Sequence, residues 1–118
     1  MDHSLIHDAL QEYKEGLGEL ERHLPEVARH YHAFTHACFT DGELPSQVKH
    51  LIGLALGVLT NDEYCILYHT KGAVDQGASD MQVMEAAAVS AAFGGGSAMA
   101  QAVTLVQDAL QAFKGHTH

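Results

Sequence analysis

Apolar residues along the chain recur at steps of three and four, which is the spacing of one face of an α-helix. The N-terminal stretch shows this spacing from Leu5 to Leu20, and the same spacing returns in each later segment. No segment alternates apolar and polar residues in the way of a half-buried strand. The pattern therefore predicts an all-α chain.

Residues that favour helix ends divide the chain into about six helices. Ser4 is expected to cap the first helix, Asp62 is one of three capping residues before the fourth, and Ser79 with Gln82 forms a capping box for the fifth. A run of three glycines separates the last two helices. Because the connections are short, we expect a single domain over residues 1–118. The expected helices are 4–22, 25–38, 46–59, 62–76, 79–93 and 97–113.

Charge and composition narrow the range of partners. The chain has 15 acidic and 6 basic residues, for a net charge of -9 with histidine neutral. Nucleic acids and anionic membranes attract Lys and Arg clusters, so neither is expected as a partner. The longest apolar run, residues 51–59, is much shorter than the ~20 residues of a membrane-spanning helix. A chain this short also gains by burying surface in an oligomer.

The cysteine content and the N-terminus predict a cytoplasmic location. Cys38 and Cys65 are the two cysteines, too few for a disulfide framework. The first residues lack the basic region and apolar run of a signal peptide. Residues 115–118 are expected to form a loose tail and are left out of any site.

The start of the fourth helix carries the residues with the clearest chemistry. Asp62, Cys65 and His69 are three and four residues apart, so they share one helix face. A thiol in the first turn is close to the positive end of the helix dipole, which favours the thiolate. A histidine one turn later can accept or return its proton. This column of side chains can support thiol chemistry.

His50 on the preceding helix can join this group. If the two helices run antiparallel, the rise of ~1.5 Å per residue brings His50 to within about a turn of His69. Spacing alone leaves open whether the two side chains face each other. It also leaves open the simpler interpretation, in which Cys65 is a small buried apolar residue and His50 lies on the surface.

Several stretches, in this order along the chain, carry a resemblance to a known family: Phe39–Pro45, Lys49–Ala55, Glu63–Thr70, Glu85–Val89 and Phe93–Gly96. The segment from Phe34 to about Ala102 resembles the alkylhydroperoxidase D-like, or carboxymuconolactone decarboxylase, family. The resemblance implies an all-α fold with a helical hairpin that carries the site. It also implies assembly as a homotrimer, or as a homohexamer in small single-domain members.

The family motif assigns roles to the same residues. In peroxidase members the site contains a glutamate, two cysteines three residues apart, and a histidine. The second cysteine and the histidine match Cys65 and His69, whereas His50 replaces the glutamate and Asp62 replaces the first cysteine. The resemblance implies a peroxiredoxin-type oxidoreductase with antioxidant activity. It would reduce organic hydroperoxides with a thiol reductant protein and no cofactor, and Cys38 is a candidate resolving cysteine.

A metal site is an alternative. Asp62, Cys65 and His69 could act as three ligands, and His50 could add a fourth. Oxygen, sulfur and nitrogen donors together suit a divalent transition metal such as zinc. The second helix has a further i,i+4 histidine pair at His32 and His36.

A third interpretation is a family member with another reaction or with none. Members that decarboxylate lactones work without the cysteine pair, and a binding or assembly role needs no catalysis. In that case the aromatic side chains of Tyr64, Tyr68 and Phe93 could line a small-molecule pocket. All three interpretations place the functional centre where the third and fourth helices meet.

Overall fold

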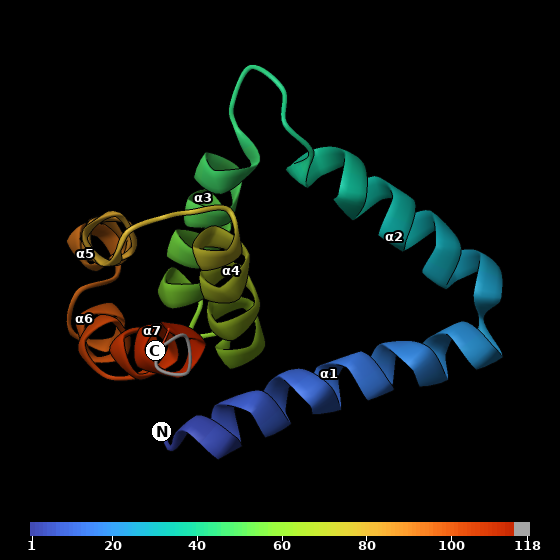
Figure 1. Cartoon of the computed structure of the whole chain (residues 1–118), viewed down its shortest axis with the longest axis horizontal. Helices are drawn as coiled ribbons and strands as arrows, with labels where there is room; N and C mark the ends of the chain where they lie inside the picture. The colour runs from blue at the N-terminus through green and yellow to red at the C-terminus, as the bar shows by residue number, and fades with distance from the viewer. Residues whose placement is uncertain (115–118) are drawn as a thin grey trace.

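The computed structural model describes residues 1–114, and within this range the protein is all-α, as the sequence predicts (Figure 1). The expected tail at 115–118 lies outside the described residues. No helix within residues 1–114 combines the length and apolarity of a membrane span. The helices are α1 (His3–His23), α2 (Pro25–Phe39), α3 (Ser46–Leu59), α4 (Glu63–Asp75), α5 (Asp80–Gly94), α6 (Gly96–Val103) and α7 (Leu105–Lys114).

Side-chain caps begin three of the helices, α1, α4 and α5. The capping box of Ser79 and Gln82 is confirmed, and the Asp62 carboxylate accepts the Cys65 backbone N–H at 3.1 Å at the start of α4. The expected cap of α1 is wrong by two residues, because Asp2 is the N-cap and Ser4 lies inside the helix. The Asp2 carboxylate accepts hydrogen bonds from both the backbone N–H and the hydroxyl of Ser4. An ionised carboxylate is the stronger acceptor and therefore takes the cap.

The described residues form seven helices, close to the six expected, because the expected helix 97–113 is two helices. The break falls at Thr104, whose backbone leaves the helical region at φ -118° and ψ -82°. Its hydroxyl donates to the Ala100 carbonyl at 2.6 Å, a local hydrogen bond that competes with the helical pattern. The turn directs the apolar face of α7, from Leu105 to Phe113, onto α4 and α1.

The helices α3 to α7 form the body of the protein, with the antiparallel α3–α4 hairpin at its centre (Figure 1). α5 packs against α3, α6 packs against α5, and α7 packs against α4. The body holds most of the core. Its largest fully buried side chains are Leu54, Val58, Ile66, Leu67, Val83 and Val106.

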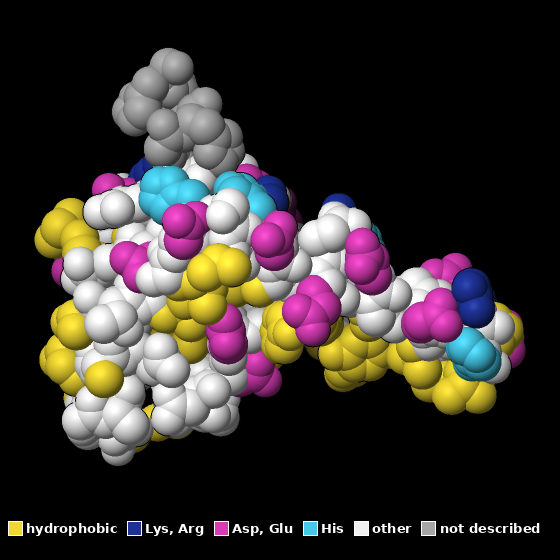
Figure 2. Space-filling model, turned by 90° about the horizontal axis from the view of Figure 1, so that it is seen from below, with side chains coloured by type: hydrophobic (Ala, Val, Ile, Leu, Met, Phe, Trp, Pro, Cys, Tyr) yellow, Lys and Arg dark blue, Asp and Glu magenta, His cyan; other side chains and the backbone are white. Residues whose placement is uncertain are grey.

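The helices α1 and α2 form an arm that projects from the body and bends near Leu24 (Figure 1). The first part of α1 is anchored by Ile6, which is fully buried in the core. In α2 only Ala28 is buried, whereas Val27, Tyr31 and Phe34 are at least half exposed. Figure 2 shows hydrophobic side chains gathered along one edge of the projecting arm, with acidic side chains above them.

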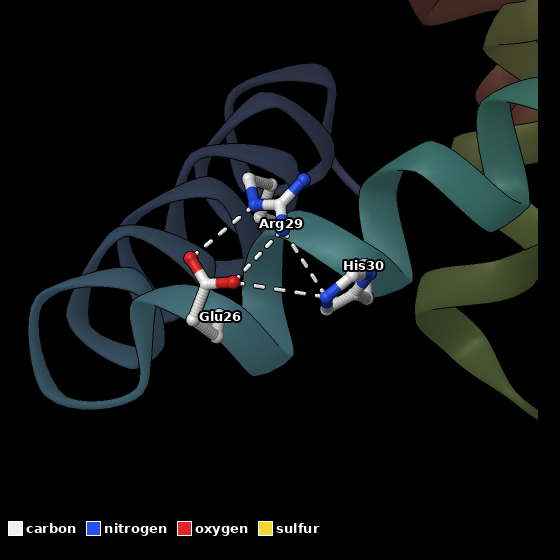
Figure 3. A network of polar contacts seen from close by, with 3 residues as sticks. All are labelled: Glu26, Arg29 and His30. Carbon is white, nitrogen blue, oxygen red and sulfur yellow. Dashed lines mark hydrogen bonds and ion pairs between the residues drawn. The ribbon is translucent and has the colours of Figure 1, made fainter.

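The other face of α2 is polar and is stabilised by local ion pairs (Figure 3). The Glu26 carboxylate, in the first turn, lies 2.8 Å from Arg29 and 3.7 Å from the His30 ring. Arg29 also donates to the His30 ring nitrogen at 3.2 Å. Exposed ion pairs of this kind contribute little to stability, so α2 depends on its apolar side for firm packing.

Candidate functional site

A cavity of about 950 Å³ lies between the arm and the α3–α4 hairpin. All four residues predicted from the sequence line it: His50 from α3, and Asp62, Cys65 and His69 from the start of α4. The remaining wall combines five tyrosine and phenylalanine side chains with polar ones. It includes Tyr13 from α1, Tyr31 and Phe39 from α2, and Tyr64 and Tyr68 from α4.

The two histidines of the hairpin face each other. The Nδ1 atom of His50 lies 3.1 Å from the Nδ1 atom of His69, so one ring donates a hydrogen bond and the other accepts it. This settles the question that helix spacing left open. The side chains meet because α3 and α4 run antiparallel and place the two positions at one level.

Burial keeps both imidazoles neutral at pH 7. The pKa of His69 is lowered to about 4, chiefly by burial and also by His50, while Asp62 opposes the shift. The pKa of His50 is also lowered by burial, against the opposing effect of Asp75. In a neutral pair that shares one Nδ1 proton, the donor ring has a basic Nε2 and the acceptor ring has an Nε2–H. The pair can therefore supply both a proton acceptor and a proton donor.

Cys65 does not have the activated thiol that its place in the first helical turn predicts. Burial raises the pKa of the Cys65 thiol, and the negative charge of Asp62 with its hydrogen bond to the thiol raises it further. The helix dipole is outweighed because Asp62, the residue that caps α4, places a full negative charge beside the sulfur. The thiol is the resting form of this cysteine at pH 7.

Three glycines allow the hairpin to hold these side chains between its helices. A Cβ atom added to Gly72 would lie 2.5 Å from His50 Nδ1, and one added to Gly53 would lie 2.8 Å from His69 Nδ1. A Cβ atom on Gly57 would lie 3.0 Å from the Cys65 Cβ. Each of the three reactive side chains thus packs against a glycine of the opposite helix. We call this arrangement the glycine register.

Phe39 is the main site residue that the sequence analysis did not single out. Its ring stacks on His50 at 4.8 Å and on His69 at 4.9 Å, with interplanar angles of 24° and 22°. The glycine register was also missed. A usable signal existed for the glycines, since glycine inside a helix costs about 1 kcal/mol and calls for a packing reason.

The other candidate residues divide between the cavity and the surface. His32 and His36 line the cavity, as do Tyr64 and Tyr68. Phe93, near the end of α5, is not part of the described lining and is 80% exposed. Both cysteines are free thiols, and Cys38 is exposed and outside the described cavity lining.

The metal interpretation receives no geometric support from the described residues. Within residues 1–114, no group of three or more His, Cys, Asp and Glu side chains is arranged to hold a metal ion. The Asp62 carboxylate is engaged in capping α4, and the His69 Nδ1 atom is engaged with His50. A zinc site at these residues stays a prediction, which elemental analysis of protein purified without a histidine tag would test.

The sequence pattern of the carboxymuconolactone decarboxylase family matches residues 25–108, from the start of α2 into α7. The chain belongs to this family. Members of the family include decarboxylases and alkylhydroperoxidases. The resemblance seen in the sequence is therefore confirmed at the level of the family.

Two bacterial relatives match over most of the family region. The uncharacterized protein 4 in the cox locus of Paracoccus denitrificans is 37% identical over 86 residues, which cover 73% of this chain and 78% of the relative. An uncharacterized protein of Cupriavidus necator is 34% identical over 87 residues, covering 74% and 77%. These relatives support the family and assign no reaction.

Solved structures show the same fold. A carboxymuconolactone decarboxylase family protein from Legionella pneumophila superimposes with a TM-score of 0.84 at 24% identity, covering 96% of this chain and 97% of that one. A protein from Thermotoga maritima gives a TM-score of 0.63 at 24% identity, covering 86% and 98%. Both similarities concern the fold.

Proposed function

We propose that this family member is a thiol-dependent peroxidase that reduces organic hydroperoxides through Cys65, with His69 as its proton partner. The observation that carries the proposal is the placement of Cys65 and neutral His69 on one wall of the same cavity. Aromatic side chains form much of the remaining wall, which suits an organic hydroperoxide better than hydrogen peroxide. Family membership supports the same chemistry.

The first step forms a sulfenic acid on Cys65. The thiol proton passes to the accepting ring nitrogen of the histidine pair as the sulfur attacks the terminal peroxide oxygen, so that no free thiolate accumulates. The O–O bond breaks, sulfur supplies two electrons, and the leaving alkoxide takes the proton from the histidine pair. The products are an alcohol and the Cys65 sulfenic acid.

The second half-reaction uses an external thiol, because Cys38 is exposed and outside the described cavity lining. A first external thiol condenses with the sulfenic acid and releases water, which leaves a mixed disulfide on Cys65. A second external thiol displaces Cys65 and leaves as the oxidised disulfide. The two thiols together supply the two electrons of turnover, and either a small thiol or a reductant protein can provide them. Free thiols at both cysteines also suit the reducing cytoplasm that the sequence predicts.

The decisive experiment measures intact mass after the reduced protein receives one equivalent of cumene hydroperoxide. We expect the wild-type protein and Cys38→Ser to gain one oxygen atom, and Cys65→Ser to stay unmodified. Loss of two hydrogens in the wild type, absent from both single variants, would instead assign Cys38 as the resolving cysteine. If wild type and Cys65→Ser both stay unmodified, the peroxidase proposal fails.

A second candidate is an acid–base reaction such as lactone decarboxylation. The observation that favours it is the hydrogen-bonded pair of neutral imidazoles, which needs no thiol. Its test is release of carbon dioxide from a carboxylated lactone. In that case Cys65→Ser keeps activity and His69→Gln loses it, the reverse of the ranking expected for peroxide reduction.

We also propose that the chain forms a homo-oligomer, a homotrimer or homohexamer as the family resemblance implies, through the exposed apolar side of α2. A 15-residue helix with one buried side chain gains little stability from this chain alone. Phe34→Glu is expected to lower the mass measured by sedimentation, whereas Ala33→Glu on a neighbouring face serves as the matched control. A monomeric wild-type protein would contradict the proposal.

A further inference from the structure

Phe39 occupies an unusual position at the last residue of α2. Its ring lies nearly parallel to both imidazoles, at 4.8 Å from His50 and 4.9 Å from His69. On the helix-packing side, Gly72 and Gly53 lie against the same two rings. The imidazole pair is therefore covered by a phenyl ring on one side and held against the opposite helix at the glycine positions.

We propose that Phe39 is a positioning residue, which holds the His50 and His69 rings in their hydrogen-bonded orientation and keeps water away from them. This deepens the proposed function, because it assigns to the arm a part in setting the proton partner of Cys65. Phe39 has no proton to transfer. It acts through the two histidines.

The backbone around Phe39 is tied to the body, so the ring is held in place. The Thr40 carbonyl accepts a hydrogen bond from Lys49 Nζ at 2.6 Å, and the Asp41 carboxylate accepts one from the Ser46 backbone N–H at 2.6 Å. These bonds join the end of α2 to the first turn of α3. The rest of α2 has few contacts with the body, so the position of Phe39 is set by the C-terminal end of α2.

Stacking by Phe39 contributes to the burial of the pair. Burial is the largest cause of the lowered pKa of both histidines, and Phe39 covers a face of each ring. The other titratable groups near the pair come from every packed element and stay unchanged when Phe39 is replaced. They are Tyr13 of α1, Tyr31, His32 and His36 of α2, Asp41 of the following loop, and Asp62, Tyr64, Cys65, Tyr68 and Asp75 of α4 and its N-cap.

The test is a set of three variants followed by NMR of the imidazole C–H signals. Phe39→Leu keeps an apolar side chain but removes the aromatic face, Phe39→Tyr keeps that face, and Phe34→Leu replaces the 66% exposed phenylalanine of the same helix. A phenyl ring stacked on an imidazole shifts its C–H signals upfield. We expect this shift to be lost in Phe39→Leu and kept in the other two variants.

A pH titration of the same signals gives the second readout. The midpoint of His69 is expected to rise above about 4 in Phe39→Leu, because leucine covers less of the two rings, and to stay near the wild-type value in Phe39→Tyr and Phe34→Leu. A variant that only loosens the fold would not be restored by tyrosine. Unchanged signals and an unchanged midpoint in Phe39→Leu would overturn the proposal.

This readout separates the inference from the proposed function. If the His69 midpoint moves in Phe39→Leu but Cys65 of the wild type never gains oxygen, the positioning role stands and the peroxidase proposal fails. If Cys65 is oxidised at equal rates in wild type and Phe39→Leu and the midpoint does not move, the peroxidase proposal stands and the role of Phe39 fails. Each of these outcomes supports one of the two proposals and contradicts the other.

Discussion

The α3–α4 hairpin and α2 of the arm both have an apolar stripe, but the chain covers much of that stripe in the hairpin and leaves it exposed in α2. α3 buries Gly53, Leu54, Gly57 and Val58, whereas the similarly long α2 buries only Ala28. The difference lies in the partners, because α3 contacts α4, α5 and α6 and α2 contacts little beyond its two neighbours. An apolar stripe shows that a helix has a side to cover. It does not show what covers that side.

The largest expected effect comes from breaking the close packing of the hairpin. Gly72→Ala places a Cβ atom 2.5 Å from His50 Nδ1, inside the distance that real contacts allow. Overpacking of this kind lowers the free energy of unfolding by about 1–3 kcal/mol. Urea unfolding measures the loss, and the His50 NMR signals should move. An unchanged midpoint together with unchanged signals would show that the helices separate without cost.

The pH dependence of stability is the next largest effect, and it depends on the burial of His69 in the body. The pKa of His69 is about 4 in the folded protein and ordinarily 6.5, so the unfolded chain binds the extra proton between these values. The free energy of unfolding should therefore fall as the pH drops from about 6.5 to about 4. His69→Gln should flatten this slope, and His23→Gln in the arm is the matched control. Equal slopes in both variants would contradict the expected role of His69.

A smaller effect concerns the carboxylate beside Cys65. Asp62→Asn removes a negative charge that raises the pKa of the thiol, while asparagine still caps α4. The pKa of Cys65 should fall, and alkylation by iodoacetamide at pH 7 should become faster by a few-fold. Burial, the larger cause, remains. Cys38 in the same sample is the internal control, and an unchanged ratio of the two rates would assign the whole shift to burial.

The smallest effect is expected in the arm. A Cβ atom added to Gly16 of α1 meets no atom within 4 Å, in contrast to the crowded glycines of the hairpin. Alanine favours the helix over glycine by about 0.5–1 kcal/mol. Gly16→Ala should therefore raise the free energy of unfolding by about this amount. A destabilised Gly16→Ala variant would mean that this side of α1 is covered in the assembled protein.

Local signals in the sequence were sufficient to predict most of the fold. The capping box of Ser79, the stop at Gly77 with its positive φ of 90°, and the break at Gly95 all fall where their chemistry predicts. The break at Thr104 carried no such signal. It depends on where the apolar face of α7 must point, which is a property of the packed body.

The candidate site could be predicted in its members but not in its electrostatics. Helix spacing brought Asp62, Cys65 and His69 together, and antiparallel pairing added His50. The state of the thiol could not be read from spacing, because it depends on burial and on the Asp62 carboxylate that also caps the helix. The role of Phe39 could not be predicted from the sequence for a similar reason. Its contact joins two elements whose relative placement no local pattern encodes.

The glycine register has a consequence for how such a site can change through evolution. His50, Cys65 and His69 each lie against a position of the opposite helix that has no room for a side chain. A smaller residue at 69 would free space for alanine at 53, and a smaller residue at 50 would do the same for alanine at 72. Substitutions in this hairpin should therefore occur as coupled pairs, one on each helix. The residue opposite a reactive position then indicates which side chain, and so which chemistry, that position can hold.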